Sequence, residues 1–309
     1  MRQKAGVRFP AARRLLSSTE PRTLQDRRYM VELKARNVGE LIGAVKEISS
    51  GWRESITDPQ ELWFRGQPKR SFPLLPGLYR PQIVKYHFHE PSLIGHFRTL
   101  AAPHTPIRPT DDWEWSFLAQ HYGLPTRLLD WTQSLVAAAY FAVCEAVLCR
   151  DRLSVDEDLR VGRMEPIFDD ASPTVWLIDA GTLNRHACGA DIVLYPGGPR
   201  TKHYLPDAIE EAKLPENEHP VAILAPRANV RIVAQQGTFT VHGHSAKPIE
   251  QLAAECQGPP IQIGCVVLDR ANLAFFWDEL QLVGVGRLTL FPDLDSVAAH
   301  VKWQFQSVR

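Results

Sequence analysis

Apolar residues recur at every third or fourth position in several segments of this chain, the spacing of a helix that buries one face. After Asn37, a residue type that often caps helices, this spacing continues through 38–48. It also follows an aspartate in 111–122, where Gly123 and Pro125 act as stop signals. The same pattern predicts helices at 84–101, 130–149 and 271–283, and a last helix that starts near Asp293 or Asp295.

Shorter runs rich in β-branched and aromatic residues predict the strands. They lie at 29–35, 61–67, 174–179, 222–243, where two strands fit, and 261–269. Because these strands are scattered among helices without a regular alternation, we expect an α+β fold with a central mixed or antiparallel sheet flanked by helices. One large domain would span 29–309, with irregular insertions at about 150–172 and 185–219.

The composition limits the classes of function. A chain of 309 residues, 44% of them hydrophobic, can bury a large core. Lys and Arg together number 35, as do Asp and Glu, so no overall field draws the protein to nucleic acid or to a membrane. No apolar run approaches the roughly 20 residues that span a bilayer. Five cysteines without a Cys-x-x-Cys pair favour reduced thiols and a cytoplasmic location.

The first 28 residues form a basic arm, with eight Lys or Arg against two acids. This composition is similar to that of a transit peptide. The alternatives are a mobile arm, or a segment that packs on the domain or on a partner.

The charge at Arg65 is unexpected in a strand as apolar as 61–67. A guanidinium at a strand end offers two parallel donors to a phosphate or carboxylate, and Gly66 would let a ligand approach the backbone. The alternative is a buried arginine that pairs with Asp130 and fixes the sheet to the apolar helix.

A second group of candidate residues lies at 121–130, around a Gly-Leu-Pro turn. His121 can donate to a ribose hydroxyl or move a proton, and Tyr122 can stack on a base. Thr126 and Arg127 would begin an extended or helical segment. For Asp130 we expect helix capping, or pairing with one of the two arginines, before catalysis.

The segment 229–239 reads as a strand that places Arg231 and Gln235 on one face. Gln235, near a glycine bulge, suits a ligand hydroxyl, and a solvent-facing amide is the alternative. The histidines around 85–104 lack the spacing of a metal site, so no metal is expected.

Several motifs together resemble the FRG domain family. They are the Phe-Arg-Gly at 64–66, GLPTRLLDWTQSLVAAAYFA at 123–142, VWLID at 175–179, RIVAQQGTF at 231–239 and LFPDLD at 290–295. The resemblance extends over roughly 38–300.

The order of these motifs has a weaker similarity to the ADP-ribosyltransferase superfamily, which implies a corresponding fold. In those enzymes an early arginine anchors NAD, a Ser or Thr supports the nicotinamide ribose, and a late Glu or Gln supports the reacting ribose. These roles would fall on Arg65, Thr126 and Gln235. Because the last position is Gln rather than Glu, three options follow: Asp130 substitutes for it, the amide suffices, or the nucleotide is bound without turnover.

The first hypothesis is therefore a nucleotide-binding pocket that transfers or hydrolyses the ADP-ribose of NAD, an activity that would suit a toxin or an anti-phage effector. NAD would be its cofactor, and no membrane partner is expected; an acceptor protein or nucleic acid and the oligomeric state are left open. The alternative is a non-catalytic module that senses a ligand in the same pocket. The catalytic candidates are His121, Asp130 and Gln235. The binding candidates are Arg65, Gly66, Tyr122, Thr126 and Arg127.

Overall fold

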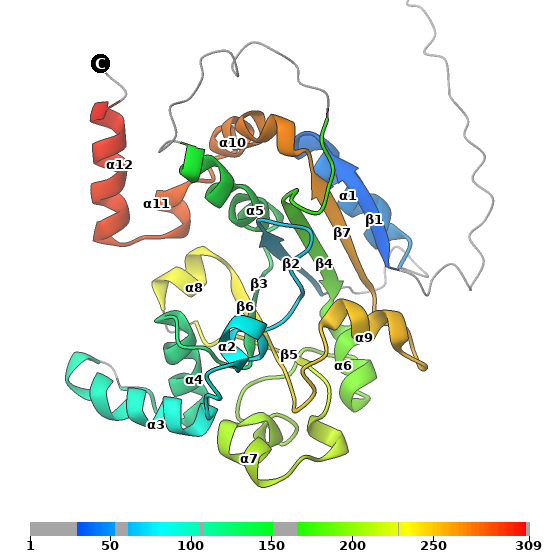
Figure 1. Ribbon diagram of the computed structural model, residues 1–309, viewed down its shortest axis with the longest axis vertical. Helices are drawn as coiled ribbons and strands as arrows, with labels where there is room; N and C mark the ends of the chain where they lie inside the picture. The colour runs from blue at the N-terminus through cyan, green and yellow to red at the C-terminus, as the bar shows by residue number, and fades with distance from the viewer. Residues whose placement is uncertain (1–29, 53–60, 106–107, 151–165, 228, 307–309) are drawn as a thin grey trace, which may run out of the picture.

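A seven-stranded sheet crosses the centre of the protein (Figure 1). The computed structural model describes residues 30–52, 61–105, 108–150, 166–227 and 229–306, so the basic arm lies outside the described residues. In the order in which they lie side by side, the strands are β1 (Val31–Ala35), β7 (Ile263–Leu268), β4 (Thr174–Asp179), β2 (Leu62–Gln67), β3 (Leu128–Thr132), β6 (Gly237–Val241) and β5 (Val221–Ile223). Only β1 and β7 pair in parallel, and the other neighbouring strands pair antiparallel. The predicted α+β fold with a mixed sheet is confirmed.

Helices cover both faces of the sheet. One face carries α1 (Val38–Ser50), α5 (Leu135–Arg150) and α10 (Leu273–Leu282). The opposite face carries α6 (Ala180–Cys188) and α9 (Ile249–Glu255). The remaining α-helices are α2 (Pro81–Val84), α3 (Glu90–Ala101), α4 (Asp112–His121), α7 (Pro206–Glu211), α8 (Val230–Ala234), α11 (Arg287–Leu290) and α12 (Leu294–Gln306). Short 3-10 turns occur at Gly77–Tyr79, Ala102–His104, Lys202–Tyr204, Pro215–Asn217 and Arg270–Asn272.

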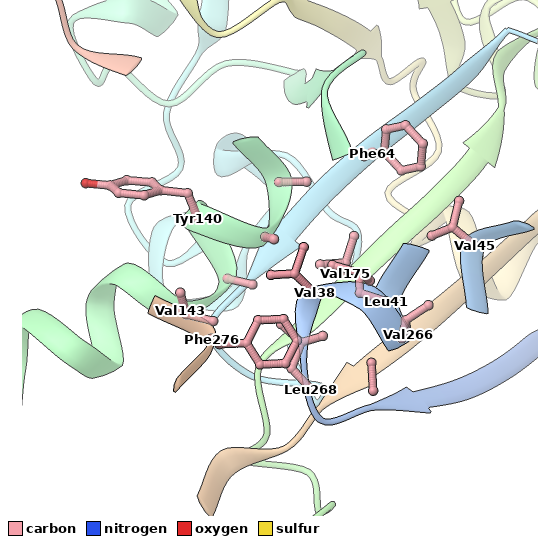
Figure 2. Close-up of a cluster of buried hydrophobic side chains, with 14 of the residues drawn as sticks. Val38, Leu41, Val45, Phe64, Tyr140, Val143, Val175, Val266, Leu268 and Phe276 are labelled. Carbon is pink, nitrogen blue, oxygen red and sulfur yellow. The ribbon is translucent and has the colours of Figure 1, made fainter. Parts of the chain in front are cut away.

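The central strands are buried on both faces because each alternates between two apolar layers. On β4, Val175 and Leu177 join the layer under α1, α5 and α10, whereas Trp176 and Ile178 join the layer under α6 and α9. Figure 2 shows the first of these layers, to which α1, α5, α10 and the strands β2, β4 and β7 contribute buried side chains. This sandwich explains why the strands read as nearly continuous apolar runs.

Helix α5 approaches β2 more closely than a side chain would allow. A Cβ built on Gly66 would lie 1.9 Å from the carbonyl oxygen of Ala138 and 2.6 Å from the backbone nitrogen of Ala142. Glycine on the strand and alanines on the helix together permit this contact. The sequence predicted that Gly66 leaves space for a ligand, and this interpretation was wrong. The side of Gly66 on which a side chain would stand faces helix α5.

Strands β2 and β3 separate soon after they meet. They share a single registered pair, Phe64 with Thr132, although β2 forms six pairs with β4 on its other side. Beyond Phe64, toward Gln67, the hydrogen-bonded ladder stops. We call the opening between Arg65–Gln67 and Asp130–Trp131 the β2–β3 seam.

Two predicted helix starts are confirmed by their caps. The side chain of Asn37 accepts a hydrogen bond from the Glu40 N–H, and that of Asp111 accepts one from the Glu114 N–H. The last helix begins at Leu294, and the Asp293 carboxylate accepts the Ser296 N–H. Local sequence determines such caps, which is why they were predictable.

Three local predictions were wrong. Residues 85–89 interrupt the helix expected at 84–101, because Pro91 sits in the first turn of α3 and starts a new helix there. Asp130 is not a helix cap, since it lies inside β3, where it pairs with Phe239. The expected strand through 231 is the short helix α8, capped by Asn229, and Gln236 (φ 47°) turns the chain into β6.

The irregular insertion predicted at 185–219 consists of the end of α6, turns and short helices. Most of the one predicted at 150–172 lies outside the described residues. Cys144, Cys188, Cys256 and Cys265, the cysteines whose side chains are described, form no disulfide. In the described part of the chain, no helix combines the length and the apolar character needed to cross a membrane.

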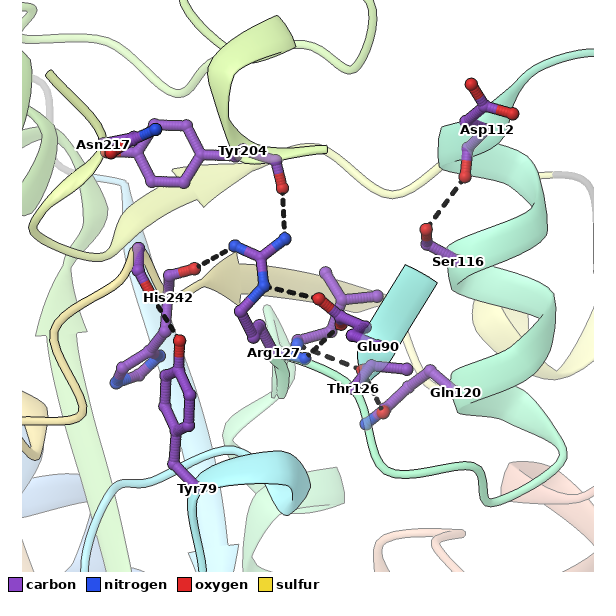
Figure 3. A network of polar contacts seen from close by, with 12 residues as sticks. Tyr79, Glu90, Asp112, Ser116, Gln120, Thr126, Arg127, Tyr204, Asn217 and His242 are labelled. Atoms are coloured by element: carbon purple, nitrogen blue, oxygen red, sulfur yellow. Dashed lines mark hydrogen bonds and ion pairs between the residues drawn. The ribbon is translucent and has the colours of Figure 1, made fainter. Parts of the chain in front are cut away.

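Arg127 is the residue directly before β3. It is the centre of a buried network of polar contacts, which we call the polar node (Figure 3). Its side chain pairs with Glu90 and donates to the backbone carbonyls of Tyr204 and His242. Glu90 also accepts the Arg127 backbone N–H. Both charged side chains are more than nine-tenths buried, so their charges are balanced by each other. The node joins the start of α3, the start of β3, the 3-10 turn at Lys202–Tyr204 and the residue that follows β6.

His242 lies next to this node, and neither ring nitrogen has a described hydrogen-bond partner of normal geometry, although the Lys247 backbone weakly favours the protonated ring. Burial, together with the positive charge of Arg127, lowers the pKa of His242 to about 3. The ring is therefore neutral and packs edge to face against Tyr79.

We predict that replacing Gly66 by Ala destabilises the protein by about 3 kcal/mol or more, because the new methyl group collides with the backbone of α5. Urea unfolding measures this change. The matched control is Gly43→Ala on α1, where a Cβ meets no atom within 4 Å. Better helix propensity there should raise stability by up to about 1 kcal/mol. Equal effects at both positions would contradict the close contact.

We also predict an acid sensitivity that originates at His242. The unfolded chain takes up a proton near pH 6.5, whereas folded His242 resists protonation down to about 3, so stability is lost as pH falls through this window. Because of His242, the free energy of unfolding falls by about 2 kcal/mol between about pH 7 and pH 5. Urea unfolding of wild type and His242→Phe at both pH values should show a smaller pH dependence in the variant. Identical pH dependence would show that His242 is not held neutral by the fold.

Candidate functional site

A pocket of about 390 Å³ opens at the β2–β3 seam. Residues of β2, β3, β6, α4, α5 and α8 line it, together with Gln235 after α8. Much of the wall is aromatic, formed by Phe64, Phe117, Trp131, Phe141 and Phe239. Eight of the sixteen lining residues have polar or charged side chains, so polar groups lie beside the aromatic surface throughout the pocket.

Arg65 spans the seam. Its Nη1 donates to the backbone carbonyl of Asp130 at 2.6 Å and lies 3.9 Å from the Asp130 carboxylate. The side chain is 15% exposed and lines the pocket. Its Nε is buried and makes no hydrogen bond to a described residue, an arrangement that is uncommon in folded proteins. Burial lowers the pKa of Arg65 to about 10, with Asp130 opposing this shift and Arg80 adding to it. The group keeps its positive charge at neutral pH.

Asp130 carries the one carboxylate among the described residues that line the pocket, and its side chain is 59% exposed. Gln120 of α4 donates from Nε2 to this carboxylate at 3.0 Å. The hydroxyl of Thr126 donates to Oε1 of the same glutamine at 2.7 Å, which fixes the amide so that its N–H faces Asp130. Thr126 is fully buried and supports the site from behind.

His121 lines the pocket at the end of α4. Partial burial lowers its pKa, the nearby charge of Arg231 lowers it further, and Asp130 acts in the opposite direction. The imidazole is therefore largely neutral at neutral pH and can accept a proton. Its Nε2 lies 3.4 Å from the side-chain nitrogen of Asn229, the residue that caps α8.

Gln235 lines the pocket, but its side chain is used by the fold. Its Nε2 donates to the backbone carbonyl of Leu290 at 3.0 Å, and its backbone carbonyl accepts the Thr132 hydroxyl at 2.6 Å. These bonds join the end of α8 to α11 and to β3. Gln235 is thus less available to a ligand than the sequence interpretation required.

The structure brings together five of the eight predicted site residues: Arg65, Gly66, His121, Asp130 and Gln235. The other three do not line the pocket. Tyr122 is 68% exposed and packs beside His121 and Phe97. Arg127 is committed to Glu90 in the buried node, and Thr126 contacts Gln120. Within the continuous segment 121–130, some residues therefore line the pocket and others support the fold around it.

Gln120 and Arg231 also line the pocket, but the sequence interpretation gave them no role. Gln120 precedes His121 by one residue, and only the position of β3 shows that it reaches Asp130. Arg231 was placed on a strand with Gln235, and the helix α8 changes its surroundings. Its guanidinium lies over the ring of Phe291, 4.5 Å from the centroid.

The arrangement suits a ligand that carries both negative charge and hydroxyl groups. Arg65 and Arg231 can hold anionic oxygens, Asp130 can accept from hydroxyls, and the aromatic wall can contact a flat ring. No group of three or more His, Cys, Asp or Glu side chains in the described residues is arranged to hold a metal ion.

Comparison with known proteins gives one family. No curated protein and no solved structure matches the chain. The model of the FRG domain matches residues 60–148, a stretch that contains β2, α2, α3, α4, β3 and most of α5. It therefore includes Arg65, Gln120, His121 and Asp130 and ends before α8. The match confirms the resemblance read from the Phe-Arg-Gly and the motif that follows it, over residues 60–148.

Proposed function

We propose that the pocket binds a nucleotide such as NAD, and that the protein transfers or hydrolyses its ADP-ribose. The observation that carries this proposal is the position of Arg65, a mostly buried arginine that lines a pocket of about 390 Å³ next to the exposed carboxylate of Asp130. A purely structural arginine at the seam would not require a cavity at its side.

In this proposal Arg65 binds phosphate oxygens. One guanidinium nitrogen is fixed by the carbonyl of Asp130, so the side chain is held in place before the ligand arrives. Such preorganisation reduces the entropy that binding costs. A guanidinium also presents its donors in a plane that matches phosphate, which an ammonium group does not.

Asp130 is the better candidate for the group that supports the reacting ribose. Gln235, which the superfamily resemblance suggests, donates its amide to Leu290, whereas Asp130 keeps an exposed carboxylate in the pocket. A negative charge near the ribose stabilises the oxocarbenium-like centre that forms as the bond to nicotinamide breaks. Water then adds at that carbon, and neutral His121 would accept its proton.

A non-catalytic ligand-sensing role is the second candidate, and one observation favours it. The Asp130 carboxylate already accepts a hydrogen bond from Gln120 and lies 3.9 Å from Arg65, so the fold engages this carboxylate before a ligand arrives. The same groups would bind a nucleotide without turning it over. NAD hydrolysis would suit a toxin or defence effector, whereas sensing would suit a regulatory module.

We predict that Arg65→Lys weakens NAD binding at least about tenfold, because the ammonium group cannot replace the planar fork. Isothermal titration calorimetry measures the change in Kd. The matched control is Arg98→Lys, which alters an exposed arginine outside the pocket and should leave binding unchanged. Thermal unfolding checks that both variants fold. A folded Arg65→Lys protein that binds NAD as tightly as wild type would exclude Arg65 from the site.

We predict that Asp130→Asn lowers nicotinamide release from NAD about 100-fold while Kd changes little, because the carboxylate acts on the developing charge rather than on the bound ground state. Chromatography of the released nicotinamide measures this rate. Asp112→Asn, at an exposed ion pair on α4, serves as the control. Wild-type protein that binds NAD but releases no nicotinamide would support the sensing role instead.

A further inference from the structure

We infer that Arg231 is a second anion-binding group of the pocket, and that the natural ligand carries two linked phosphates rather than one. This inference rests on the proposed nucleotide-binding function and specifies the ligand class as a nucleoside diphosphate or a dinucleotide.

The surroundings of Arg231 leave its donors available. Its guanidinium lies over Phe291, and its side chain makes no ion pair with any described residue. Stacking on a ring uses the flat face of a guanidinium and leaves the N–H groups at its edge free. Because Arg231 lines the pocket, these N–H groups are within reach of a ligand there.

The side chains that line the pocket carry a net positive charge, which favours an anionic ligand. Arg65 and Arg231 contribute two positive charges, and Asp130 contributes one negative charge that lies nearest to Arg65. His121 adds little positive charge, because burial and Arg231 lower its pKa. A partly buried cation without a carboxylate partner costs free energy, and an anionic ligand removes that cost. Asp293, which does not line the pocket and forms no ion pair with Arg231, acts on this arginine from outside the pocket, so no acidic side chain inside the pocket balances Arg231.

Two phosphates fit this distribution better than one. Arg65 already donates Nη1 to Asp130 and therefore has only part of its fork for a ligand. It comes from β2, whereas Arg231 comes from α8, which packs on β6. Two arginines from separate elements of one pocket can each contact one phosphate of a pyrophosphate. A single phosphate would have to be shared between two arginines, one of which already donates to Asp130.

The segment after α10 holds Arg231 in position. Phe291, on which the guanidinium lies, also packs against Tyr140 and Phe141 of α5. The preceding carbonyl, that of Leu290, accepts the Gln235 amide at the other end of α8. Helix α8 is short and would not hold an arginine rigidly without these contacts.

The test compares ADP-ribose, which has a pyrophosphate, with AMP, which has one phosphate. Calorimetry is carried out on the full chain of wild type, Arg231→Gln and Arg231→Lys. The matched control is Arg227→Gln, which removes an exposed arginine just before α8 that does not line the pocket. We expect wild type and the control to bind ADP-ribose at least about tenfold more tightly than AMP. Arg231→Gln should lose most of this preference while its affinity for AMP changes little.

Arg231→Lys keeps the charge but loses the planar fork, and we expect an intermediate preference; it also serves if the Gln variant does not fold. A folded Arg231 variant that keeps the full preference for ADP-ribose would overturn the inference. So would wild type that binds both ligands equally. If Arg65→Lys weakens ADP-ribose binding but Arg231→Gln does not, only the present inference fails. If wild type binds neither NAD nor ADP-ribose, the proposed function fails with it.

Discussion

The hydrogen bond from Arg65 to the backbone carbonyl of Asp130 is the interaction on which the site depends. Strands β2 and β3 share one registered pair and then separate, so backbone groups at the seam lose their partners in the sheet. An unpaired carbonyl inside a protein costs free energy. Arg65 supplies the missing donor with one nitrogen and keeps the rest of its guanidinium beside the pocket. The structural and ligand-binding interpretations of this arginine are therefore compatible.

The three residues of the Phe-Arg-Gly motif have three different tasks. Phe64 packs into the apolar layer under α5, Arg65 crosses the seam, and Gly66 admits the backbone of α5. Because the helix contacts the strand directly, the position of Arg65 is fixed from the layer behind it. This arrangement explains why an apolar strand contains a charge followed by a glycine.

The sequence predicted features that depend on local chemistry and missed those that depend on distant contacts. The caps at Asn37 and Asp111 and the mixed sheet were predicted correctly. Asp130 was taken for a helix cap because the apolar run after it resembles a helix, yet pairing with β6 makes it part of a strand. No local signal separates Arg127, which is sealed against Glu90, from Arg65, which faces a pocket. Both arginines lie among apolar residues in the sequence. Only the tertiary fold places Arg127 against the Glu90 carboxylate and Arg65 beside the pocket.

The pocket draws its charges from two parts of the chain with different electrostatic roles. The matched FRG segment contributes Arg65 and Asp130, which largely compensate each other. The later segment contributes Arg231, which is stacked on Phe291 and forms no ion pair with a described residue, while Asp293 acts on it from outside the pocket. The net positive charge of the pocket thus originates outside residues 60–148. Two proteins with the same Phe-Arg-Gly segment would therefore differ in the charge of the ligand they accept if they differ in the residue that occupies the position of Arg231.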